Sequence, residues 1–179
     1  MKKIFNLLKG LFKKREDETA FDFYTFTDLF IKSSDSSLNV FHSKTYVSFL
    51  TNLNEHIGSL AIDKIVSCVP FNDKIAIETL DVGNYKLQEI DWCLLEVDFG
   101  FLDKSRVLMT DFSLKNLNFF DLPKNLIIII HQDNIYKTLD ECMLKLKEKY
   151  NTNNYSVNAI SLSEFKSKFE KISLFVNSF

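Results

Sequence analysis

Six carboxylates crowd the middle of the chain, and their types and spacing come nearest to a catalytic pattern. They are Asp91, Glu96, Asp98, Asp103, Asp111 and Asp121. Two carboxylates on adjacent strands can share a divalent cation, as enzymes that hydrolyse phosphodiesters require. Asp91 and Asp111 are therefore candidate catalytic residues. The alternative is that these acids form a solvated surface, since the whole chain carries a formal charge of −2.

The elements expected around these acids are a helix, three or four strands, a helix, a strand and a helix. This order resembles the restriction-endonuclease-like fold, in which an aspartate and an acidic-x-lysine pair lie on neighbouring strands. Asp91 matches the first aspartate. Asp111 falls near the second position, with Ser113 in place of the lysine. The resemblance implies a metal-dependent phosphodiesterase that is degenerate, because the residue that helps to activate water is replaced.

His131 and Asp133 form the second candidate site. They follow residues 126–130, five apolar residues of which four are β-branched, and this run predicts a strand covered on both faces. Parallel α/β sheets place their sites where such a strand ends and its helix begins, and the helix start favours an anion. Against an activity, the sequence has no glycine-rich phosphate loop, and Asp133 is more simply a helix cap.

The cysteines and histidines predict neither a metal site nor a cofactor. Cys68, Cys93 and Cys142 each sit in an apolar element without ligand spacing, which favours buried thiols in a reducing compartment. The three histidines also lack the spacing of metal ligands. His56 falls beside the apolar stripe of a helix, so we expect it to be a hydrogen-bonded structural histidine.

A helix over residues 135–150 is the clearest structural prediction. Its apolar side chains form one stripe, at spacings of 4, 3, 1, 3 and 4 residues. Glu141 precedes Lys145 at the spacing that favours an ion pair. Asp133 or Asn134 would cap it. Asparagines in 151–154 end it, because this residue tolerates the left-handed conformation that closes helices.

A second strand-helix unit follows. Residues 155–160 are expected to form a strand, and Ser161 with Glu164 matches a capping box. An apolar stripe then predicts a helix over 165–176. Strand, helix, strand and helix with short loops imply a right-handed crossover and two parallel neighbouring strands.

The middle of the chain has the period of strands. Strands are expected over 62–69, 74–79, 85–97 and 106–110. Asn72 and Asp73 predict a hairpin between the first two, and the whole stretch reads as an antiparallel meander. Before it, residues 46–57 predict a helix with Ser43 as its cap and Gly58 as its stop.

This order of elements predicts an α+β, or mixed α/β, fold with helices packed on a mixed sheet. At 179 residues, 46% hydrophobic and 26% charged, the chain is long enough for one folded domain and short for two. We expect residues 19–179 to form that single domain. No apolar run reaches the length needed to span a bilayer.

Residues 1–18 are expected to form a separate arm. Its first 15 residues carry +6 and no acid, so residues 16–179 carry −8. The apolar residues of the arm fall on one helical face, which suits an anionic membrane surface. The alternative is a helix that docks on the domain or on a partner. The residues expected at the membrane surface are Lys2, Lys3, Ile4, Phe5, Leu8, Lys9, Leu11, Phe12, Lys13 and Lys14.

These observations favour a non-catalytic protein-interaction module whose partner is another protein. The acidic body and the scarcity of arginine argue against nucleic acid. Such a module would be an assembly or adaptor component at a membrane surface, or a toxin-neutralising immunity protein. We expect a bacterial cytoplasmic protein, with the inner face of the membrane as the surface that the arm would meet. The rival class is an enzyme, either the phosphodiesterase using Asp91 and Asp111 or an activity centred on His131.

Overall fold

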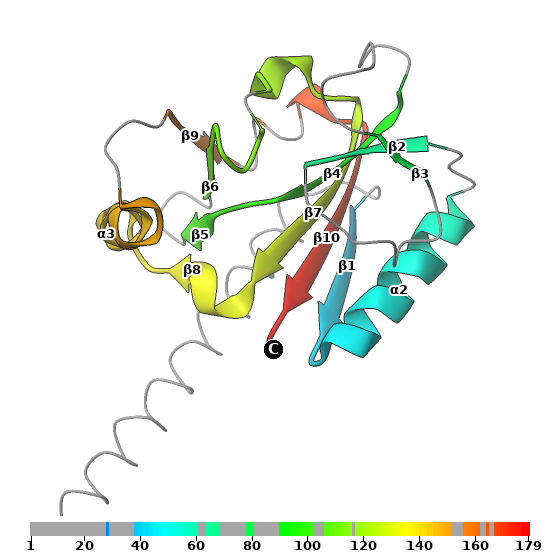
Figure 1. Cartoon of the computed structure of the whole chain (residues 1–179), viewed down its shortest axis with the longest axis horizontal. Helices are drawn as coiled ribbons and strands as arrows, with labels where there is room; N and C mark the ends of the chain where they lie inside the picture. The colour runs from blue at the N-terminus through cyan, green and yellow to red at the C-terminus, as the bar shows by residue number, and fades with distance from the viewer. Residues whose placement is uncertain are drawn as a thin grey trace, which may run out of the picture.

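The computed structural model describes residues 28, 38–60, 64–68, 78–80, 90–101, 106–115, 117–151, 156–161, 164 and 167–179. Within these residues the fold is mixed α/β in a single domain, as the sequence predicts (Figure 1). In chain order the elements are β1 (Leu38–Ser43), α2 (Tyr46–Ser59), β2 (Lys64–Ser67), β3 (Glu78–Leu80), β4 (Trp92–Glu96), β5 (Phe99–Phe101), β6 (Arg106–Thr110), the short 3-10 helix η2 (Phe119–Asp121), β7 (Asn125–His131), a second one η3 (Gln132–Asn134), β8 (Ile135–Tyr136), α3 (Leu139–Tyr150), β9 (Val157–Ser161) and β10 (Lys171–Asn177).

A parallel sheet is the centre of the fold. Its strand order is β1-β10-β7-β4-β2-β3, and each neighbouring pair is parallel. The apolar run of residues 126–130 lies in β7, between β10 and β4, and all five side chains are buried. The prediction of a central strand covered on both faces is therefore confirmed.

A smaller mixed sheet packs against one face of the parallel sheet. Its order is β8-β5-β6-β9, with β5–β6 and β6–β9 antiparallel and β5–β8 parallel. The chain passes directly from β4 of the first sheet into β5 of the second, with only residues 97 and 98 between them. Two strands that are consecutive in the chain thus belong to different sheets.

The molecule is layered in the order α2, parallel sheet, mixed sheet and α3 (Figure 1). Phe49, Leu53 and Ile57 of α2 pack on the first face of the parallel sheet. The buried cluster on its second face includes Val107 and Met109 of β6, so the mixed sheet covers that face. On the far side of the mixed sheet, α3 buries a pair of side chains, Cys142 and Leu146.

Helices α2 and α3 each begin at a threonine capping box. In α2, Thr45 and Ser48 exchange side-chain to backbone hydrogen bonds of 3.1 and 3.2 Å. In α3, Thr138 and Glu141 do the same at 3.3 and 3.1 Å. Ser43 is therefore not the cap of α2 as predicted, because it is the last residue of β1. The exchanged bonds satisfy amides that have no partner within the helix.

The predicted end of α3 is confirmed, and the predicted end of α2 is wrong. Asn151 closes α3 with a left-handed φ of 45°, as predicted. Gly58 does not stop α2, which continues to Ser59 and is closed at Leu60. The predicted start of the second helix at 135 is also wrong, since Ile135 and Tyr136 form β8 and α3 begins at Leu139.

The helix predicted over 165–176 is wrong in its second half, because Lys171–Asn177 is β10, whereas Glu164, Ser167 and Lys168 are helical. Its side chains are buried from Ile172 to Asn177 between α2 on one face and the mixed sheet on the other. A strand covered on both faces loses its alternation, so apolar residues at any spacing match it. The reciprocal hydrogen bonds expected between Ser161 and Glu164 do form, at 2.7 and 3.2 Å.

The predicted antiparallel meander is also corrected. The hairpin expected at Asn72 and Asp73 is contradicted, because β2 and β3 pair in parallel. Antiparallel pairing in this region is found between β5 and β6. The strand of 155–160 exists as β9, but it joins the mixed sheet beside β6 and does not become a parallel neighbour of β7. Local sequence patterns predict that a segment forms a strand, whereas the strand it pairs with depends on contacts between residues that are distant in the sequence.

The arm of residues 1–18 lies outside the described residues, so the amphipathic helix expected there stays a prediction. In the described part of the chain, no helix has the length and apolar character needed to cross a bilayer.

Candidate functional site

Polar side chains gather at the carboxyl edge of the parallel sheet. Parallel strands all end at this edge, and ligands of α/β proteins bind outside it. Ser43 of β1, Asn177 of β10 and His131 of β7 are register partners across three neighbouring strands. Glu96 is the last residue of β4, the next strand, and its register partner on β7 is Ile129.

These side chains point to the side of the sheet that α2 covers. Ile129 and Phe175 belong to the cluster that packs on α2. Alternate residues of a strand share a face, so His131 and Asn177 lie on the same side two residues further on. The same alternation from Leu94 places Glu96 there. The carboxyl edge is thus the end of the α2-side core, where apolar side chains give way to polar ones.

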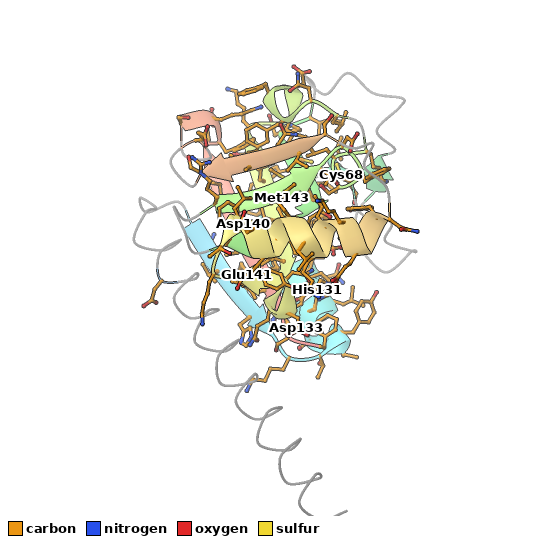
Figure 2. The ribbon with its side chains drawn as sticks, turned by 90° about the vertical axis from the view of Figure 1, so that its left-hand side faces the viewer. Cys68, His131, Asp133, Asp140, Glu141 and Met143 are labelled. Carbon is orange, nitrogen blue, oxygen red and sulfur yellow. The ribbon has the colours of Figure 1, made fainter. Side chains whose placement is uncertain are left out.

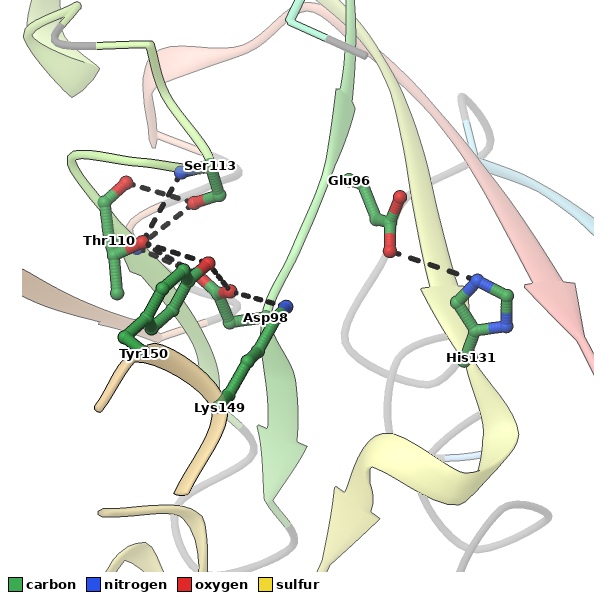
Figure 3. Close-up of polar contacts among 7 residues, drawn as sticks. All are labelled: Glu96, Asp98, Thr110, Ser113, His131, Lys149 and Tyr150. Carbon is green, nitrogen blue, oxygen red and sulfur yellow. Dashed lines mark hydrogen bonds and ion pairs between the residues drawn. The ribbon is translucent and has the colours of Figure 1, made fainter. Parts of the chain in front are cut away.

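Glu96 and His131 lie next to each other at this edge and form an ion pair when the imidazole is protonated. His131 Nε2 lies 3.7 Å from Glu96 Oε1, and the two side chains are 35% and 37% exposed (Figure 3). A separation of 3.7 Å exceeds hydrogen-bond length. No other described residue donates a hydrogen bond to this carboxylate. Both oxygens of Glu96 therefore remain acceptors that a ligand from solvent can reach.

Exposed apolar side chains adjoin the ion pair. The ring of Phe179 lies 6.0 Å from the ring of His131 and 5.9 Å from the ring of Tyr46, centroid to centroid. Tyr46 and Phe179 are exposed, and Val47, in the first turn of α2, is 73% exposed. We call the four linked residues Tyr46, Glu96, His131 and Phe179, together with Val47, which follows Tyr46 in α2, the edge corner.

The edge corner rests on a packed aromatic base. The buried ring of Phe49 lies 6.2 Å from Phe179 and 6.1 Å from Phe175. The amide of Ser178 donates to the carbonyl of Ser43 at 3.0 Å, which fixes the backbone just before Phe179. The exposed rings are therefore held in place before any partner arrives, which lowers the entropy lost on binding.

One buried acceptor behind this surface lacks a donor. Asn177 is 2% exposed, and its Oδ1 atom has no hydrogen-bond partner. Its neighbour Ser43 accepts a hydrogen bond from Asn52 Nδ2 at 3.1 Å. A buried carbonyl without a donor costs about 1–3 kcal/mol. The carboxyl edge therefore holds a buried acceptor that is not paired within the described residues.

A second polar cluster lies where β4 passes into β5. The buried carboxylate of Asp98 accepts four hydrogen bonds (Figure 3). Its Oδ2 accepts from the amide and hydroxyl of Thr110 at 2.9 and 3.0 Å. Its Oδ1 accepts from Lys149 Nζ at 2.8 Å and from the hydroxyl of Tyr150 at 2.6 Å. This cluster ties the last turn of α3 to the mixed sheet.

The electrostatics of the cluster favour the charged carboxylate. Burial pushes the pKa of Asp98 upward, but the hydrogen bonds from Lys149, Tyr150 and Thr110 outweigh burial and hold the pKa below its ordinary value. The pKa of Lys149 is raised, because its bond to Asp98 outweighs the opposite effect of burial. Since every hydrogen bond of Asp98 is internal to the fold, we assign it a structural role.

The structure does not bring the candidate acids Asp91 and Asp111 together. Asp91 precedes β4 at the amino edge of the parallel sheet, where its carbonyl accepts from the amide of Asn125 at 3.0 Å. Asp111 follows β6 in the other sheet, next to Thr110, which bonds Asp98. Asp91 and Asp98 are seven residues apart along an extended chain, roughly 20 Å. Among the described residues no cluster of three or more His, Cys, Asp or Glu could hold a metal ion.

Asp133 lies near His131 but does not have the role predicted for it. With α3 in front, Figure 2 shows both residues toward the same end of the molecule, below the helix. Asp133 is exposed in η3, and the cap of α3 is Thr138, five residues later. His131 therefore does not stand at the start of α3 but precedes the three-residue η3, and the expectation that the start of a long helix favours an anion there is wrong.

The three cysteines and His56 belong to the core. Cys68, Cys93 and Cys142 are free and buried, as expected. Burial raises the pKa of Cys142 to about 12. His56 is buried, and its Nε2 lies 2.6 Å from the hydroxyl oxygen of Ser173, which agrees with the predicted structural role. Burial also lowers the pKa of His56.

Sequence reasoning found His131 and missed most of its surroundings. Asn177 was hidden directly behind a predicted helix, although it follows an apolar run just as His131 does. A polar residue directly after a buried run is the signal that could have found it. Tyr46 and Phe179 carry no such signal, because an exposed aromatic residue and a buried one look alike in sequence.

Comparisons with known proteins bear on the fold. No protein-family model matches the chain, and no curated protein matches it. A solved structure, described as a DUF162 family protein from Deinococcus radiodurans, is similar to it with a TM-score of 0.67 and 12% sequence identity. The match covers 89% of this chain and 98% of that one. At this identity the likeness establishes the architecture, a parallel α/β sheet with a mixed second sheet, and nothing about activity.

Proposed function

We propose that this protein is a protein-interaction module and that its partner docks on the edge corner. The observation that carries the proposal is the contact of Phe179 with both Tyr46 and His131, which makes one continuous surface from exposed apolar side chains and an ion pair. Protein interfaces have an apolar, aromatic centre and a polar rim. Grouped exposed apolar side chains mark such sites, whereas single ones are ordinary.

The structure of the edge corner suits binding to a macromolecule. Its aromatic rings rest on the buried Phe49, so little conformational entropy is lost when a partner covers them. Tyr and Phe offer a large contact area with few rotatable bonds and are enriched at interfaces. Burying Val47 alone, now 73% exposed, adds an apolar anchor of about 1.5–3 kcal/mol.

The experiment is affinity capture from the native host with the full-length protein and two variants. Val47→Glu places a charge in the edge corner, and we expect the partner to be lost. Leu144→Glu is the matched control, because Leu144 is 60% exposed on α3 and belongs to a different layer of the fold. Thermal unfolding of each variant checks that it is folded. Equal capture of one partner by both variants would refute the docking site.

Two finer roles are proposed for such a module. One is an assembly or adaptor component that residues 1–15 hold at an anionic membrane surface, which the +6 charge of those residues supports. The other is neutralisation of a toxin, for which the charge of −8 on residues 16–179 would complement a basic partner. The identity of the captured protein, a membrane-associated component or a toxin, separates the two roles.

A further inference from the structure

In the edge corner, the carboxylate of Glu96 lacks a hydrogen-bond donor. His131 Nε2 lies 3.7 Å from Glu96 Oε1, which exceeds hydrogen-bond length. Neither oxygen of the Glu96 carboxylate therefore accepts a hydrogen bond from a described residue. Behind it, Asn177 is a register partner of His131 and carries a buried Oδ1 atom that also lacks a donor. A partner that completes this surface must therefore bring donors, and a positively charged group matches the carboxylate best.

Lys149 does not fill this need. Lys149 lies close enough to Glu96 for their charges to interact, but its ammonium is bonded to Asp98 Oδ1 at 2.8 Å. Asp98 is buried and Lys149 supplies one of its four hydrogen bonds. Moving Lys149 to Glu96 would uncover a buried charge, which is costly. Glu96 thus stays open to a cation from outside.

We propose that the edge corner recognises an arginine of the partner protein, next to an apolar side chain in the same segment. This inference rests on the proposed function and names the chemistry of the partner. A guanidinium offers five donors in a planar fork and binds a carboxylate through two parallel hydrogen bonds. It also stacks on aromatic rings, and Phe179 lies beside the ion pair.

The apolar neighbour of that arginine would cover Tyr46 and Val47. Charge supports the choice of a basic segment, since residues 16–179 carry −8. When the guanidinium takes Glu96, His131 is released from its ion pair. Its ring then has a nearby acceptor in Asn177, the register partner on β10. Binding would in this way also supply a donor to the buried carbonyl.

The first test uses small probes and the full-length protein. Leucyl-arginine amide is titrated against ¹⁵N-labelled protein, and leucyl-citrulline amide serves as the matched uncharged probe. We expect the arginine probe to shift the amide signals of His131 and Phe179, and the citrulline probe to bind at least about tenfold more weakly. Equal binding of the two probes, or shifts confined to other surfaces, would overturn the inference.

Variants link the probes to the partner. Glu96→Gln keeps the shape of the side chain and removes its charge, and Asp133→Asn makes the same change on an exposed carboxylate outside the edge corner. We expect Glu96→Gln to weaken probe and partner by about tenfold and Asp133→Asn to change neither. If Val47→Glu loses the partner but Glu96→Gln captures it unchanged, the proposed docking site stands and the proposed recognition of an arginine is refuted. Unchanged capture with both would refute the proposed function as well.

Discussion

Replacement of Asp98 by asparagine tests the cluster that joins α3 to the mixed sheet. The carboxylate accepts two hydrogen bonds on each oxygen, whereas an amide has one oxygen. We expect the amide oxygen to keep the buried Thr110 donors, because these cannot reach water. Tyr150 and Lys149 would then face an NH₂ group and lose their acceptor.

The expected cost follows from those two lost bonds. A hydrogen bond to a charged group contributes about 1.5–3 kcal/mol. The side chain of Lys149 is 41% exposed and can be hydrated again, so its share is reduced. We therefore expect Asp98→Asn to lower the free energy of unfolding by about 2–3 kcal/mol. Glu148→Gln, which breaks the exposed Lys145–Glu148 pair, should cost less than about 1 kcal/mol.

Urea unfolding followed by tryptophan fluorescence measures both variants. Trp92 is the single tryptophan and is buried at the start of β4, so its emission reports loss of the parallel sheet. The folded pKa of Asp98 is lowered, so its stabilisation is present above the unfolded pKa of about 3.9 and is lost as pH falls through the folded pKa. Asp98→Asn should remove that acid-dependent part. A loss no larger than that of Glu148→Gln would refute the assigned role.

Two further predictions concern α2 and α3. Burial lowers the pKa of His56, so the folded protein binds fewer protons than the unfolded chain. The contribution of His56 to stability is therefore full above about pH 6.5 and falls as the pH drops through that value. Urea midpoints measured at about pH 7.5 and pH 5 should depend less on pH in His56→Leu than in the wild type. Asn151→Ala should lower the free energy of unfolding by about 1–2 kcal/mol, because alanine is strained at a φ of 45°. Asn151→Gly should be tolerated, because glycine adopts this conformation without strain. Thermal unfolding compares the two variants, and equal melting temperatures would contradict the prediction.

The parts of the fold that local patterns specify were predicted from the sequence. The β-branched run of 126–130 could only be a buried strand, and the stripe of α3 has the period of a helix. Residues 172–176 were misassigned because β10 is covered on both faces. Ser173 added to the error: a polar residue inside an apolar run suggests an amphipathic helix, whereas here it meets His56 in the core.

The site was predicted less well than the fold. His131 was found because polar residues after buried runs lie at the edge where α/β sheets bind ligands. Its pairing with Glu96 depends on β4 lying next to β7, and this neighbourhood joins segments about thirty residues apart that no local period connects. Asp91 and Asp111 looked comparable to Glu96 in sequence, and only the assignment of strands to two sheets separates them.

The place of β10 in the sheet has a consequence for how the chain folds. β1 pairs with β10, and its register joins Leu38 to Ile172, across most of the described chain. Loop closure over such a span is slow, so this pairing should form late. Until residues 171–177 are available, β1 presents an open strand edge carrying Val40 and Phe41, which other chains could join. During synthesis, this edge of β1 therefore stays without its native partner until the C-terminal strand has emerged.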